Sequence, residues 1–144
     1  MKRALTCVLL GGAALLSSAG CDALADLIGP TRVTVVLVNA VDDFSVEATV
    51  IYDDIQEIPE AVLLETGEQL EYTIAAGDSV TFSRPCDELQ AIMIEDADLL
   101  VLPGIGPETS SDVQRDGDDF SCGDTLVFTF TGGATDLNVS VSTR

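Results

Sequence analysis

Residues 125–142 read TLVFTFTGGATDLNVSVS, and this stretch decides the fold class. Apolar side chains recur at every second position on both sides of the two central glycines: Leu126, Phe128, Phe130, Leu137, Val139 and Val141. Successive side chains of a strand point to opposite faces of its sheet, so this period of two predicts two strands with one buried face each. The glycine-containing segment 131–134 predicts the turn between them.

The same alternation recurs through most of the chain. The predicted strand segments are 33–38, 46–52, 70–74, 80–82, 89–94, 99–102, 126–130 and 137–141. The run 89–94 is nearly all apolar and is expected to be buried on both faces, and the acidic residues 95–98 are expected to end it. About seven to eight short strands separated by turn residues are typical of an all-β protein. They predict a single antiparallel β-sandwich, immunoglobulin-like or related.

One short helix interrupts this pattern. Residues 59–65 carry Pro59 at the expected first helical position, and Gly67 follows just beyond the end. Proline at the start and glycine past the end are typical of helix boundaries. The segment therefore predicts a two-turn connecting helix.

Charge excludes several classes of function. The chain has 144 residues, with 25 Asp and Glu, six Lys and Arg, and no His, for a formal charge of −19. Such a surface repels phosphate backbones, so no nucleic-acid partner is expected. Without His the chain has no Ser-His-Asp or Cys-His catalytic group and no imidazole metal site. We therefore expect a protein that is not an enzyme.

The N-terminus has the three parts of a secretory signal peptide. Lys2 and Arg3 precede the apolar segment 4–16, and small residues follow at 17–20. A membrane-spanning helix needs about 20 apolar residues, so this segment is too short to span, although an uncleaved anchor helix is the alternative. Loss of Lys2 and Arg3 leaves four Arg against 25 acids, a formal charge of −21.

Residues 16–21, LSSAGC, resemble the lipobox of bacterial lipoproteins. In that family the cysteine becomes the first residue of the mature chain and carries acyl groups, so the resemblance implies lipidation of Cys21. Ser18 stands where the family most often has Leu, which leaves ordinary signal cleavage near Gly20 open. Two or three acyl chains, at about 0.8 kcal/mol per buried methylene, give lasting attachment. The resemblance implies an exported protein anchored to the bacterial cell membrane, on its periplasmic or extracellular face.

These features divide the chain into three parts. Residues 1–20 are the predicted lipoprotein signal peptide, and residues 21–31 are a lipidated tether that contains a Gly29-Pro30 break. Residues 32–144 are the predicted β-sandwich domain. A short polar and Gly/Pro-containing linker is expected between a lipid anchor and a folded domain.

Four cysteines divide by location. Cys7 lies in the signal peptide and Cys21 is the lipidation site, so Cys86 and Cys122 remain as an even pair in an exported chain. Such a pair predicts a disulfide. The loop that it closes, with ends 36 positions apart, corresponds to about 4 kcal/mol in the chain-entropy account. Two thiols with no His do not fill a tetrahedral zinc site.

The acidic residues cluster most densely between positions 112 and 124. Calcium prefers carboxylate and carbonyl oxygens, and the candidate ligands are Asp112, Asp116, Asp118 and Asp119. The EF-hand pattern fails, since Gln114 and Gly123 occupy the third and twelfth positions. The hypothesis is therefore an irregular calcium loop, and the alternative is a solvated acidic loop. A lysine-free acidic surface also suits a high-salt environment.

A second cation site is conceivable at predicted strand ends. Asp42-Asp43 and Asp53-Asp54 would form it if the loops that carry them met at one end of the sandwich. Aspartate also favours turns for local hydrogen bonding, which explains both pairs without a ligand.

Together these features predict a non-enzymatic, lipid-anchored cell-envelope protein. It would be a binding or structural module attached to the membrane by its lipid, with an envelope protein or polymer as partner. No cofactor is expected unless the acidic loop binds Ca²⁺. The alternative is a calcium-stabilised, adhesion-like β-sandwich, and the least favoured function is a carboxylate-dependent hydrolase of envelope polymers.

Overall fold

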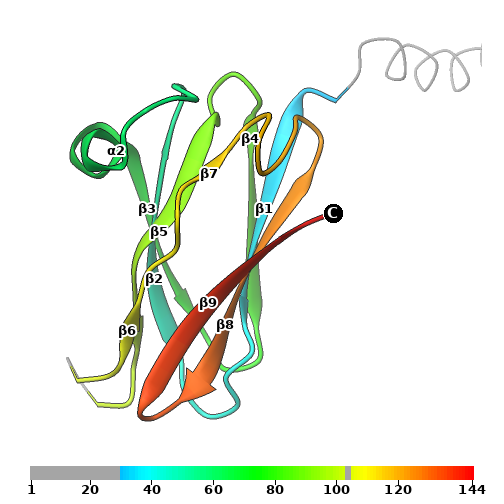
Figure 1. The fold of residues 1–144 in the computed structure, drawn as a ribbon. Helices are drawn as coiled ribbons and strands as arrows, with labels where there is room; N and C mark the ends of the chain where they lie inside the picture. Colours follow the sequence, from blue (N-terminus) through cyan, green and yellow to red (C-terminus); the bar gives the residue numbers. More distant parts are fainter. Residues whose placement is uncertain (1–29, 103–104) are drawn as a thin grey trace, which may run out of the picture. The chain divides into compact units, whose positions relative to one another are not determined.

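Two β-sheets pack face to face in the computed structural model, which describes residues 30–102 and 105–144 (Figure 1). The predicted all-β sandwich is therefore confirmed. The predicted signal peptide, Cys21 and most of the tether lie outside the described residues. Within the described part, no helix is both long enough and apolar enough to cross a membrane.

Sheet A has four strands in the order β4-β1-β8-β9. Their bounds are Arg32–Asn39 for β1, Ser79–Pro85 for β4, Thr125–Gly133 for β8 and Asp136–Thr143 for β9. The outer pairs are antiparallel, but β1 and β8 are parallel, so the expectation of a purely antiparallel sandwich is wrong at this pair. A parallel pair needs a long crossover. Here all of sheet B lies between β1 and β8 along the chain.

Sheet B has the order β3-β2-β5-β6, and β7 also pairs with β5. The bounds are Val46–Asp53 for β2, Glu68–Ile74 for β3, Ala91–Leu99 for β5, Glu108–Thr109 for β6 and Gln114–Arg115 for β7. All of these pairs are antiparallel. The described residues thus form nine strands, of which β6 and β7 have two residues each.

The core lies between the sheets and is built from alternate positions along the strands. Fully buried side chains come from the two central strands of each sheet: Val33, Val35 and Leu37 of β1, Leu126, Phe128 and Phe130 of β8, Val46, Ala48 and Val50 of β2, and Ile92 and Ile94 of β5. Burial of apolar surface at these positions is the main favourable contribution to folding.

Strand β5 departs from the sequence prediction. The acidic residues 95–98 do not end it, and 99–102 is not a separate strand, because β5 continues to Leu99. The register shifts so that Thr49 pairs with Asp96 and Val50 with Ile94, which leaves Glu95 as the extra residue of a β-bulge. The extra residue reverses the alternation. Leu99 therefore faces the core as Ile94 does.

Helix α2 (Glu60–Thr66) packs on the outer face of sheet B (Figure 1). The predicted helix is confirmed, shifted by one residue, with Pro59 as its N-cap. It covers a second apolar cluster of Ile51, Ile58, Leu63, Ala91 and Met93. This explains why the start of β5 is buried on both faces. A Cβ on Gly67 would lie 2.3 Å from Cγ2 of Ile51, so glycine permits the close approach of the helix end to β2.

The predicted disulfide between Cys86 and Cys122 is present, with the two Cα atoms 5.5 Å apart. Cys86 follows β4 directly, and Cys122 precedes β8. Because β4 and β8 flank β1 in sheet A, the bond joins the two neighbours of this central strand at one end of the sheet.

Candidate functional site

The four predicted calcium ligands lie on the segment that leads into and out of β7. The carboxylate of Asp119 accepts a hydrogen bond from the backbone N–H of Arg115 at 2.9 Å. Among the described residues, the three acids whose oxygens all lie within 4.8 Å of one another are Asp96, Asp98 and Glu108, and the predicted set supplies no such group. Calcium binding by the predicted set stays a prediction. Melting temperatures in CaCl₂ and NaCl at matched ionic strength would check it.

The two aspartate pairs do not meet. Asp42 and Asp43 precede β2, whereas Asp53 ends it and Asp54 follows. An eight-residue strand is about 25 Å long, so the pairs lie at opposite ends of the sandwich.

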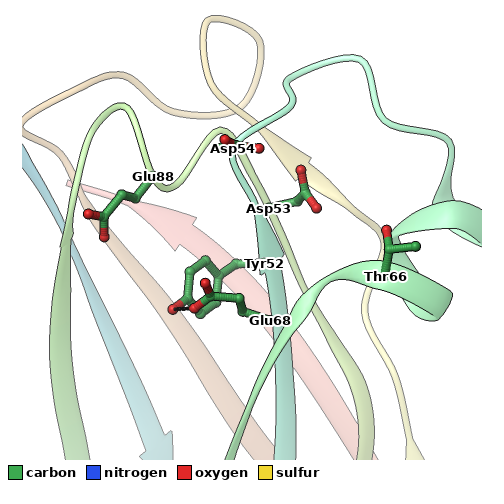
Figure 2. Close-up of a pocket in the computed structure, with 6 residues that line it drawn as sticks. All are labelled: Tyr52, Asp53, Asp54, Thr66, Glu68 and Glu88. Carbon is green, nitrogen blue, oxygen red and sulfur yellow. Dashed lines mark hydrogen bonds between the residues drawn. The ribbon is translucent and has the colours of Figure 1, made fainter.

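One hollow, here called the Tyr52 hollow, opens beside the end of β2 and has a volume of about 260 Å³. Figure 2 shows the residues that line it: Tyr52, Asp53, Asp54, Thr66, Glu68 and Glu88. The carboxylate of Asp53 accepts a hydrogen bond from the backbone N–H of Ile55 at 3.0 Å, as expected for a turn.

The hydroxyl of Tyr52 joins two opposite charges in this hollow. It donates to Glu68 at 2.5 Å (Figure 2) and accepts from the Nε–H of Arg84 at 2.8 Å. Burial raises the pKa of Tyr52, the bond to Glu68 raises it further, and Arg84 acts in the opposite direction. Arg84 lies on β4, and Tyr52 and Glu68 lie on β2 and β3, so the network ties sheet A to sheet B. A structural role accounts for these contacts.

A second hollow, here called the Asp98 hollow, lies at the other end of sheet B and has a volume of about 380 Å³. It is lined by Glu47, Asp98, Leu99, Leu100, Ile105, Gly106 and Glu108. In the strand register Glu47 lies directly opposite Asp98, and Asp98 directly opposite Glu108. Three carboxylates therefore form one row across β2, β5 and β6. The sequence alone does not predict this row, because the row depends on which strands are neighbours and on their register.

Electrostatic repulsion in the row is visible at Asp98. Burial raises the pKa of its carboxyl group, and the negative charges of Asp96, Glu108 and Glu47 raise it further. Like charges directly opposite each other on neighbouring strands are destabilising, by a few tenths to about 1 kcal/mol per pair. The row thus costs stability unless a positive charge binds to it.

Every basic residue in the described part of the chain lies at the opposite end of the sandwich. Arg32 begins β1, Arg84 pairs with Val33, and Arg144 bonds to Thr125 at the start of β8. Arg115 of β7 pairs with Ala91, the first residue of β5. The Asp98 hollow lies at the last residues of β5, so no described Lys or Arg neutralises it.

Apolar side chains stand beside the acidic row. Leu100 and Ile105, which line the hollow, are 37% and 68% exposed. Backbone bonds fix the two ends of the connection between β5 and β6: Leu100 N–H donates to the carbonyl oxygen of Ser45 at 2.9 Å, and Leu99 N–H donates to that of Pro107 at 3.1 Å. The hollow therefore has an acidic wall and an apolar wall.

Replacing Asp98→Asn is expected to raise the free energy of unfolding at pH 7 by a few tenths of a kcal/mol. A carboxyl whose pKa is raised on folding stabilises the fold only while it is protonated, and that contribution is lost as the pH rises through the raised pKa. The gain of the variant should therefore fade as the pH falls through the raised pKa, and it should be absent below 3.8, the ordinary value. Urea unfolding at pH 7 and pH 3 measures this, with exposed Asp136→Asn as control. An equal gain at both pH values would refute the account.

Comparisons with known proteins show a similarity in fold to solved structures only. No family model matches the chain, and no curated protein matches it. Among solved structures, the T6SS lipoprotein TssJ1 from Pseudomonas aeruginosa is similar at 14% sequence identity, over 79% of this chain and 98% of that chain. The TM-score is 0.41, and a likeness of this size leaves the function of the present chain open.

Proposed function

We propose that this protein is a non-enzymatic interaction module, attached to the bacterial envelope by a lipid on Cys21, whose sandwich binds a partner. The observation that carries the proposal is the Asp98 hollow. Its row of like charges costs stability, and exposed apolar side chains stand next to it. Surface features that cost stability and expose apolar area are typical of binding sites.

The path of the chain is consistent with a binding role for the end of the sandwich that carries the Asp98 hollow. The tether from Cys21 enters the sandwich at Arg32, the first residue of β1. The ten residues between them span at most about 35 Å when extended. The Asp98 hollow lies at the end of the sandwich opposite Arg32, the residue through which the chain enters β1.

The chemistry of the side chains supports a role without catalysis. The chain has no His to serve as a general base. In the Tyr52 hollow, Tyr52 and Glu68 are engaged in the bridge between the sheets, and Asp53 holds a turn.

The variant Cys21→Ser is expected to lose both its acyl mass and its membrane attachment. The lipid is bonded to this thiol in the proposed form, and several acyl chains are needed for stable anchoring. Intact mass and membrane fractionation of the native protein measure both properties. Cys7→Ser is the matched control and should keep them, because the signal peptide is removed. A cytosolic chain that retains Met1 would refute the proposal.

A further inference from the structure

We infer that the Asp98 hollow binds a cationic and apolar segment of a partner protein, with an Arg or Lys side chain on the acidic row and an apolar neighbour against Leu100 and Ile105. This rests on the proposed function as an interaction module. It adds the location of the surface and the chemistry of its occupant.

The acidic wall favours a positively charged ligand. Neighbouring strands are about 4.8 Å apart, so the carboxylates of Glu47, Asp98 and Glu108 form a row that a forked guanidinium can bridge two at a time. Burial and the neighbouring carboxylates both raise the pKa of Asp98, and a bound cation would offset the contribution of the carboxylates. Anionic polymers are repelled by the same row.

The apolar wall favours a ligand that carries apolar groups as well as a positive charge. Lys and Arg bury their aliphatic stems along apolar surface while the charged group stays at its partner. Leu100 and Ile105 supply such a surface, with exposed fractions of 37% and 68%. A metal ion bound by Asp96, Asp98 and Glu108 would make no use of these side chains. The combination therefore favours a peptide segment over an ion.

A second copy of this chain is a poor occupant. The guanidinium of Arg84 bonds to Tyr52, that of Arg115 bonds to the carbonyl oxygen of Ile58, and that of Arg32 bonds to Ser83. The cations that the described part of the chain could offer to another copy are thus largely engaged. The partner is a different protein.

Binding of two fluorescent peptides to the mature lipoprotein in neutral-lipid nanodiscs tests the inference. The peptide Leu-Arg-Leu-Arg-Leu should bind more tightly than Ser-Arg-Ser-Arg-Ser, which has the same charge. Asp98→Asn and Ile105→Ser should each raise the Kd of the first peptide on the order of tenfold, equivalent to about 1.4 kcal/mol. The matched controls Asp118→Asn and Ile55→Ser lie outside the hollow and should leave the Kd unchanged.

Three results would overturn the inference. Equal binding of the two peptides would show that the protein recognises only the positive charge of the peptide and not its apolar side chains. Equal losses of peptide affinity in Asp98→Asn and Asp118→Asn would show that the peptide is attracted by the negative charge of the whole surface and not by this hollow. Calcium binding that needs Asp98 but not Ile105, without peptide binding, would make the hollow a metal site.

A cross-linking arm separates failure of the inference from failure of the proposed function. A photo-reactive residue at position 105 in the lipidated protein should form a discrete protein adduct in cells that Asp98→Asn weakens. An adduct from position 55 alone would keep the interaction module but refute this surface. An absence of adducts together with an absence of acylation at Cys21 would refute the proposed function itself.

Discussion

Replacing Cys86 and Cys122 together by alanine is expected to lower the free energy of unfolding by about 4 kcal/mol. The disulfide closes a loop whose ends are 36 positions apart, and its loss lets the unfolded chain sample far more conformations. The total free energy of unfolding of a small domain is about 5–15 kcal/mol, so the double variant should be close to the limit of stable folding. Urea unfolding followed by far-UV circular dichroism measures the loss.

Reduction supplies the control for the disulfide prediction. The wild-type protein in reductant should unfold at the urea concentration of the double variant, and reductant should not change the variant. A wild-type protein whose midpoint is insensitive to reductant would show that the bond contributes little to stability.

The variant Asn39→Ala is expected to lower the free energy of unfolding by about 3 kcal/mol, although the change in side-chain size is small. Asn39 is fully buried at the end of β1. Its amide donates to the carbonyl oxygens of Phe44 at 2.9 Å and Ile74 at 3.0 Å, and its oxygen accepts from the N–H of Val41 at 3.0 Å. Alanine leaves these buried backbone groups without a partner, and each such group costs about 1–3 kcal/mol.

Two further variants make the Asn39 prediction specific. Asn39→Asp should be more damaging at pH 7 than Asn39→Ala, because it replaces the donor by a charged acceptor facing carbonyl oxygens. Asn138→Ala removes the same side chain from an exposed position on β9 and should change stability little. Similar losses at positions 39 and 138 in urea unfolding would contradict the assigned role.

The alternation of strand faces could be read from the sequence because it depends on local covalent geometry. The inward face of β8 is the one predicted, as is the helix after Pro59. The pairing of Cys86 with Cys122 was equally accessible, because only these two cysteines remain once Cys7 and Cys21 are assigned to the N-terminus.

The course of β5 could not be read locally. Its acidic residues 95–98 are typical of a turn, but the pairing with β2 and β6 keeps the segment extended, and the bulge at Glu95 returns Leu99 to the core. Favourable contacts with two neighbouring strands here outweigh the local preference.

The sequence by itself determined the class of fold, the disulfide and the expectation of a lipid anchor, because alternation, cysteine count and the residues before Cys21 are all local or countable. The tertiary structure alone decided that β1 pairs with β8 in parallel, that Asn39 joins three backbone segments, and that Glu47, Asp98 and Glu108 form one row. Each of these features brings together residues that are distant along the chain. Their proximity depends on strand order and register, which arise from packing the whole core at once.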